Sequence, residues 1–183
     1  GGDRLDEGVA IIQQWLFTSQ NRLTLSADYL NRPPNIDRTL GIEYAWNVLD
    51  IYRTGALSLR VGEQNGGRSL YALLTQAYEL APRLRLRLEL ESLDIDYPSD
   101  PTDRARQLIF TLNYEIDPER ALGGRLVLNR LEFGGETETT RNFYLTYLQR
   151  VRRGFDLYVI YGLPNATRAQ NRLAVKIITP LEL

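Results

Sequence analysis

The sequence predicts an all-β fold, built as an antiparallel up-and-down meander of about 10–12 strands. Apolar and polar residues alternate with a period of two through nearly all of the 183 residues, and helical periodicity is almost absent. The clearest segment is 83–91, where Leu alternates with Arg and Glu. Because successive side chains of a strand point to opposite sides, this pattern predicts strands with one apolar and one polar face.

The alternation divides the chain into eleven segments, most of them longer than the usual strand of about 5–6 residues. The segments with the most regular alternation are, in chain order, 23–29, 40–48, 57–61, 84–90, 108–116, 143–147, 155–161 and 173–177. The expected strands are 9–18, 22–32, 38–49, 55–64, 69–81, 83–95, 104–117, 122–133, 140–152, 155–163 and 170–179.

The connections between these segments suggest that the two ends of the sheet differ. Tight connections are expected at 19–21, 82, 118–120 and 153–154. They alternate with longer, more polar connections at 33–36, 64–67, 97–102, 134–139 and 164–169. This order predicts that the short turns share one end of the sheet; the connection near 50–53 is the least clear. A weak repeat, Thr75–Pro82 against Thr111–Pro118, is spaced by 36 residues, which is one hairpin plus one connection.

Composition excludes several classes of function. The chain has no Cys, His or Met, and its 22 basic and 23 acidic residues leave a net charge of −1. Without Cys or His there is no thiolate chemistry and no Ser-His or Cys-His site. The balanced charge argues against a nucleic-acid partner. We therefore expect no catalytic, cofactor-binding or metal-binding residues. The acidic segment 94–103 is interpreted as an exposed loop in preference to a Ca²⁺ site.

Aromatic residues recur at a constant distance from the expected short turns, on the apolar face. Such a ring of amphipathic aromatics is typical of a membrane–water interface, although Tyr and Trp also favour strands in general. The candidate aromatic girdle comprises Trp15, Trp46, Tyr78, Tyr114, Tyr147 and Phe155.

The chain resembles the transmembrane β-barrel proteins of Gram-negative outer membranes. The resemblance rests on the Leu/Arg alternation at 83–91, the Tyr-Glu-Leu/Ile-x-Pro hairpin ends at 78–82 and 114–118, and the closing strand at 171–178. It covers almost the whole chain and implies no subfamily. One departure is Leu183 at the last position, where the family usually has an aromatic residue.

This resemblance implies a single domain, 1–183, that closes into a barrel in the outer membrane, with the apolar face on lipid and the polar face inside. It implies a non-enzymatic pore, or the membrane sleeve of a larger assembly whose lumen holds a plug or a partner protein. The candidate pore-lining residues are Asp28, Glu43, Arg60, Arg85, Arg87, Glu89, Glu91, Asn113, Glu115, Arg125, Arg150, Asp156, Arg172 and Lys176.

Alternatives remain open from the sequence. Bacterial single-chain barrels have an even number of strands, so with eleven either one strand is missing or the count is wrong around residues 48–56. If a strand is missing, the chain is the C-terminal portion of a longer barrel, which would also explain the absent initiator Met; a mature product or an engineered chain would explain that absence as well. A soluble calycin-like barrel would invert the faces and bind an apolar ligand inside. A β-sheet scaffold would cover its apolar face with a partner.

Overall fold

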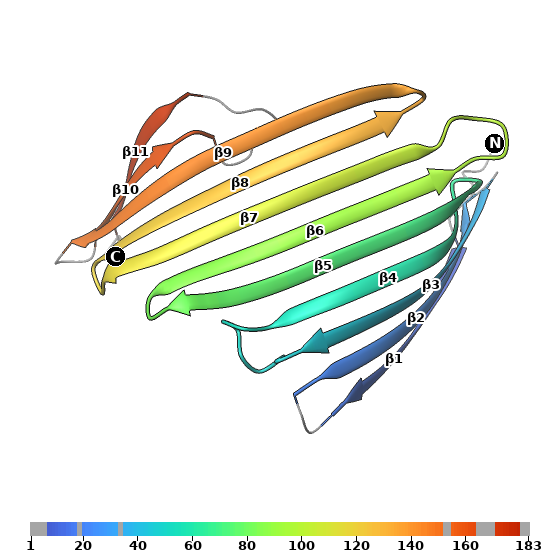
Figure 1. Ribbon diagram of the computed structural model, residues 1–183, viewed down its shortest axis with the longest axis horizontal. Helices are drawn as coiled ribbons and strands as arrows, with labels where there is room; N and C mark the ends of the chain where they lie inside the picture. The colour runs from blue at the N-terminus through green and yellow to red at the C-terminus, as the bar shows by residue number, and fades with distance from the viewer. Residues whose placement is uncertain (1–6, 18–19, 33–34, 152–154, 164–170, 180–183) are drawn as a thin grey trace.

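The computed structural model describes residues 7–17, 20–32, 35–151, 155–163 and 171–179, which form one antiparallel sheet of eleven strands in chain order (Figure 1). The all-β meander predicted from the alternation is confirmed, and the described residues contain no helix. Accordingly, no membrane-crossing helix is found among them. The strands are β1 (Glu7–Leu16), β2 (Arg22–Arg32), β3 (Asn35–Trp46), β4 (Gly55–Gln64), β5 (Gly67–Ala81), β6 (Leu84–Asp96), β7 (Asp103–Asp117), β8 (Arg120–Phe133), β9 (Glu136–Val151), β10 (Phe155–Tyr161) and β11 (Leu173–Ile178).

Two connections that the sequence suggested to be long are two-residue turns. Asn65 and Gly66 join β4 to β5, and Gly134 and Gly135 join β8 to β9, all four with positive φ. Asn-Gly and Gly-Gly pairs adopt this left-handed backbone at little cost, which closes a hairpin without extra residues. The prediction of long connections at 64–67 and 134–139 was therefore wrong, and β9 begins four residues earlier than expected.

The opposite end of the sheet carries a longer connection. The connection between β3 and β4, which the sequence left unclear, spans 47–54 and lies at the end where the short turns were expected. Among the fully described connections, 97–102 is the long one at the other end. We call these two ends of the sheet the 47–54 end and the 97–102 end.

The internal repeat corresponds to a repeated structural feature. The pairing register shifts between Glu79 and Ala81 on β5, and again between Glu115 and Asp117 on β7. Each shift immediately precedes the proline of a two-residue turn, Pro82 or Pro118. An extra residue in one strand increases its local twist, so these bulges bend the sheet at equivalent places.

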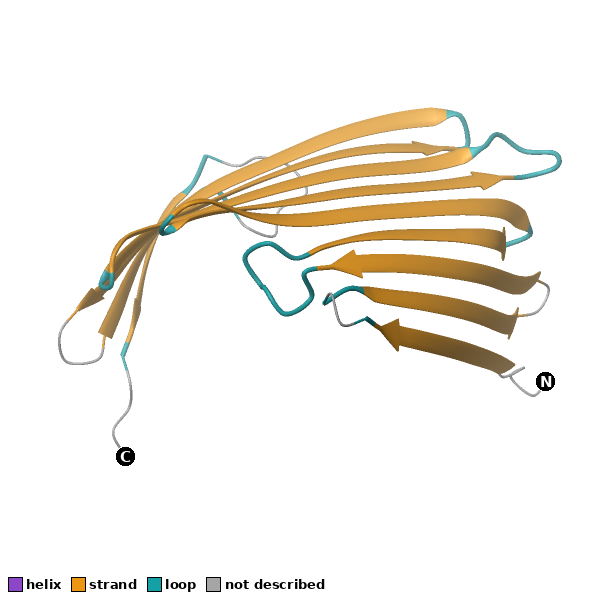
Figure 2. Cartoon of the chain, turned by 60° about the horizontal axis from the view of Figure 1, so that its bottom comes forward, coloured by secondary structure: helices purple, strands orange, loops and turns teal. Residues whose placement is uncertain are grey.

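The sheet does not close into the expected barrel: it is open, and β1 and β11 are its two edges. Figure 2 shows that the sheet is twisted and bent, with these edges apart. In a meander of eleven antiparallel strands the first and the last run in the same direction, so they cannot pair antiparallel to each other.

Candidate functional site on the polar face of the sheet

The candidate pore-lining residues lie on one face of the sheet, which we call the polar face. Direct cross-strand partners point to the same side of a sheet, so the face can be followed from strand to strand. One such row across β6–β9 consists of Glu91, Gln107, Asn129 and Thr140. Thirteen of the fourteen candidates are on strands with this facing, and Arg172 immediately precedes β11. All six girdle candidates are on the other side, the apolar face. The structure therefore separates the two predicted sets completely, while their roles stay predictions.

The polar face is the concave side of the sheet. Ile109 is 8% exposed although the next residue, Phe110 on the apolar face, is 37% exposed. Asn142 and Phe143 show the same contrast, with 5% and 40%. Side chains on the concave side of a curved sheet converge and shield one another, which explains why small polar residues are buried beside exposed aromatic ones.

Charges of opposite sign are interleaved along the polar face. Arg22 Nη2 lies 2.7 Å from Glu43 Oε1, and Arg85 Nη1 lies 2.9 Å from Glu115 Oε1. These side chains stay partly exposed, so each pair contributes little to stability. Neutral amides continue the lining, since Gln107 Nε2 donates to Asn129 Oδ1 at 2.9 Å. A lining of this kind can hold water and ions of either sign.

The 47–54 connection lies over the polar face, which sequence reasoning did not anticipate. The guanidinium carbon of Arg85 lies 4.0 Å from the centroid of the Tyr52 ring, a cation–π contact that reaches from the connection to β6. Arg53 Nη2 lies 3.8 Å from Glu79 Oε2 on β5. Leu49 and Ile51 remain 75% and 71% exposed. The position of this segment could not be predicted from the sequence, because its apolar and polar residues do not alternate with a period of two.

At the other end of the sheet, Tyr97 of the 97–102 connection lies on the polar face. The Tyr97 ring lies against Gly67, where an added Cβ would be 2.9 Å from the ring. Burial raises the pKa of Tyr97, and the carboxylates of Asp103 and Asp100 raise it further. Between the two connections, Asp28, Thr39, Arg60 and Tyr71 line part of a hollow of about 450 Å³.

The apolar face carries a band of exposed hydrophobic side chains that crosses the strands obliquely. The row of direct cross-strand partners that begins at Leu40 on β3 ends at Thr137 on β9. The outermost apolar residue of β9 on this face is instead Phe143, six residues nearer the 47–54 end. Six strand steps separate β3 from β9, so the average displacement is one residue per strand; it consists of four residues between β5 and β6 and two between β8 and β9. With about 3.4 Å per residue and 4.8 Å between strands, the band lies about 35° from the perpendicular to the strands.

Two aspartates of the acidic segment 94–103 form hydrogen bonds to neighbouring side chains. Asp94 accepts two hydrogen bonds from Arg106, at 2.7 and 2.9 Å, and Asp96 accepts one from Thr102. Within the described ranges no group of three or more potential ligand side chains is close enough to hold a metal ion.

The comparisons with known proteins identify no family. No protein-family model matches the chain, and no curated protein is similar to it in sequence.

Proposed function

We propose that this chain forms part of the wall of a transmembrane β-barrel in a bacterial outer membrane, with the polar face toward the lumen. Within that class we propose a non-enzymatic role, either as a pore or as the membrane sleeve of a larger assembly. Its direct partner is the lipid bilayer, and its lumen is open to water or occupied by a plug or partner protein.

The oblique band is the observation that carries this proposal. Strands of outer-membrane barrels tilt by about 35–45° from the membrane normal, so a level apolar band must cross them at that angle. The average displacement of one residue per strand gives about 35°. A sheet that buried its apolar face against a partner would have no reason to shift its apolar residues in one direction by an amount that matches the strand tilt of a barrel.

The curvature argues against the soluble alternative. A calycin-like barrel encloses its apolar side chains, which would have to point to the concave side. Here the concave side carries the Arg85–Glu115 and Arg22–Glu43 ion pairs, and Leu40 and Val61 are on the convex side with 64% and 51% exposure. Water is a poor solvent for an apolar face of this extent, whereas lipid would cover it.

Closure of the barrel requires additional strands. Since β1 and β11 run in the same direction, antiparallel closure needs an odd number of further strands, from another chain or another part of this protein. Direct pairing of β1 with β11 would produce a parallel seam instead.

The first test is whether the purified chain needs detergent, and whether unboiled samples migrate as a compact species on SDS gels. We expect both. A monomer that is soluble without detergent and gives one band with or without boiling would contradict the proposal.

A labelling experiment tests the facing, because the chain has no native Cys. Leu88 and Glu89 are neighbours on β6 but lie on opposite faces. In phosphatidylcholine vesicles, Glu89→Cys should react with a water-soluble maleimide and Leu88→Cys should not. Detergent-denatured samples, in which both must react, are the control.

A quenching experiment distinguishes contact with lipid from burial against protein. Brominated phosphatidylcholine should quench the fluorescence of Trp15 and Trp46, which are both on the apolar face; unquenched fluorescence would contradict contact with lipid.

Single-channel conductance separates the two roles. A pore should conduct in planar bilayers. The sleeve role is favoured by the 47–54 connection, which covers part of the polar face and presents Leu49 and Ile51 at its exposed tip. A sleeve without its partner should conduct only after this connection is shortened, and a chain that inserts but never conducts would exclude the pore.

A further inference from the structure

Three arginines lie side by side on the apolar face, immediately beyond the hydrophobic band on its 97–102 side. Arg106 on β7 follows outward from Leu108, Arg130 on β8 from Leu128, and Arg141 on β9 from Phe143. Arg106 and Arg130 are direct cross-strand partners, and Arg141 is diagonal to Arg130. Like charges directly opposite in a sheet are destabilising, so this arrangement is unfavourable unless an anion lies between them.

The same boundary on β3–β5 has a different charge pattern. There the row Arg38, Glu63 and Arg68 alternates in sign from strand to strand, and Asp96 on β6 continues the row beyond the band. Cross-strand neighbours in that row can neutralise one another without a ligand. The arginine cluster of β7–β9 is therefore a local feature and not a general property of the boundary.

The protein itself neutralises the arginine cluster only in part. Arg106 Nη2 binds both oxygens of Asp94, and Arg130 Nη2 lies 2.6 Å from Glu132 Oε1. Arg104 shares the same two carboxylates at 3.6 and 3.5 Å. No ion pair joins Arg141 to another of the residues that the structure describes. A third carboxylate, Asp96, lines the same hollow as Asp94 and Glu132 and accepts a hydrogen bond from Thr102. Four guanidinium groups thus lie near three carboxylates, which leaves one net positive charge.

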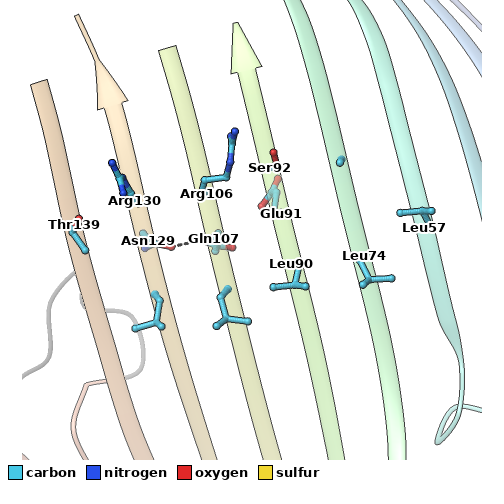
Figure 3. Close-up of a pocket in the computed structure, with 13 residues that line it drawn as sticks. Leu57, Leu74, Leu90, Glu91, Ser92, Arg106, Gln107, Asn129, Arg130 and Thr139 are labelled. Atoms are coloured by element: carbon cyan, nitrogen blue, oxygen red, sulfur yellow. Dashed lines mark hydrogen bonds between the residues drawn. The ribbon is translucent and has the colours of Figure 1, made fainter. Parts of the chain in front are cut away.

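An apolar groove adjoins the arginine cluster. It has a volume of about 460 Å³ and is lined by Leu57, Leu74, Leu90, Leu108 and Leu128, with Arg106 and Arg130 at its edge. Figure 3 shows these two arginines beside Ser92, on the 97–102 side of Leu90 and Leu74. The surface thus places a cationic patch directly beside an alkyl-sized groove.

We propose that this surface binds a phosphorylated lipid from the leaflet on the 97–102 side of the membrane. The phosphate lies among Arg106, Arg130 and Arg141, and an acyl chain lies in the leucine groove. Guanidinium groups bind phosphate oxygens in bidentate geometry, and a lipid supplies the apolar part that a free phosphate lacks. The inference rests on the proposed membrane location of the chain.

The test uses spin-labelled lipids in phosphatidylcholine vesicles that contain the inserted protein. Electron spin resonance measures the motionally restricted fraction of phosphatidic acid relative to phosphatidylcholine. We expect the wild type to retain phosphatidic acid preferentially. Replacing Arg130 and Arg141 together by Gln should lower this preference by about fivefold or more, on the scale of a basic side chain at a charged lipid surface.

The matched control replaces Arg38 and Arg68 by Gln, which removes the same charge from the same boundary and should leave the preference unchanged. The single variant Arg141→Gln disturbs no ion pair among the described residues and serves if the double variant fails to insert. Equal preferences in wild type and both double variants would overturn the proposal. Inorganic phosphate at the same concentration as the accessible phosphatidic acid should leave the preference in place, because it has no acyl chain for the leucine groove. Loss of the preference at that concentration would overturn the lipid as occupant in favour of a free anion.

Flotation of the protein with the vesicles is scored separately. A chain that does not float contradicts the membrane location, and the lipid site falls with it. A chain that floats without preference for phosphatidic acid leaves the barrel wall intact and contradicts the lipid site alone.

Discussion

Trp46 Nε1 donates a hydrogen bond of 2.9 Å to Gln76 Oε1, across two strand steps of the apolar face. The indole lies over Gly55, the residue between them, where a side chain would collide with the ring. Gln76 Nε2 in turn donates to the carbonyl oxygens of Arg53 and Thr54, at 3.2 and 3.4 Å. One amide therefore joins an aromatic residue of the expected girdle to the base of the connection that lies over the polar face.

Gly55→Ala should destabilise the protein by about 1–3 kcal/mol, because the new methyl group must displace the indole or the amide of Gln76. The free energy of unfolding in urea, followed by tryptophan fluorescence in detergent, measures this cost. Gly124→Ala is the control on the same face: its methyl group would meet only the Leu145 side-chain terminus at 3.2 Å and a carbonyl oxygen at 4.0 Å. Equal costs at the two glycines would show that the Trp46 contact is unimportant.

Leu86→Arg should cost about 2–4 kcal/mol in bilayers, because Leu86 lies within the apolar stretch of β6, between Leu84 and Leu90. Leu90→Arg, at the boundary of the band on the same strand, should cost about 0–1 kcal/mol. Reversible unfolding from vesicles in guanidinium chloride gives both values. A cost that does not depend on position along the strand would contradict contact of this face with a bilayer.

Arg85→Ala should shift ion selectivity toward cations, because it leaves Glu115 without its paired guanidinium and removes one positive charge from the polar face, while Glu79 keeps Arg53. It should also loosen the 47–54 connection, since the Arg85 guanidinium stacks on Tyr52. Reversal potentials in a salt gradient measure the selectivity. Arg68→Ala removes an arginine from the apolar face of β5 and should leave the potential unchanged. An unaltered potential in Arg85→Ala would remove Arg85 from the lining.

Stability should fall above pH 10 in a way that depends on Tyr97. Burial and nearby carboxylates raise the pKa of this residue above its usual 10.0, so folding favours the neutral phenol. That contribution is complete below the pKa of the unfolded chain and is lost as the pH rises through the higher pKa of the folded state. The free energy of unfolding measured across this range should fall less steeply in Tyr97→Phe. Identical slopes would show that Tyr97 is not coupled to folding.

Much of the fold could be predicted because a strand's facing is a local property. The alternation in Leu84–Leu90 assigns each side chain of β6 to a face without any knowledge of its neighbours. The approximate positions of the eleven strands, with bounds that differ by up to four residues, and the separation of pore-lining from girdle candidates followed from the same rule. The type of each connection was harder to predict, since Asn65-Gly66 and Gly134-Gly135 resemble loop residues until their positive φ angles are known.

The contacts between distant segments could not be predicted in the same way. Tyr52 and Arg85 are far apart in sequence, and they meet only because β4 and β5 bring the 47–54 connection beside β6. The arginine cluster likewise depends on the register of β7, β8 and β9, because a different register would place Arg106 and Arg130 opposite other residues.

By itself, then, the sequence determined the strands, their two faces and the absence of Cys and His chemistry, because these depend on composition and on a period of two residues. The tertiary structure decided which face is concave, how the apolar band crosses the strands, and which residues the 47–54 and 97–102 connections contact. Those features depend on register and bulges, which arise from hydrogen bonds between segments that are distant in the chain.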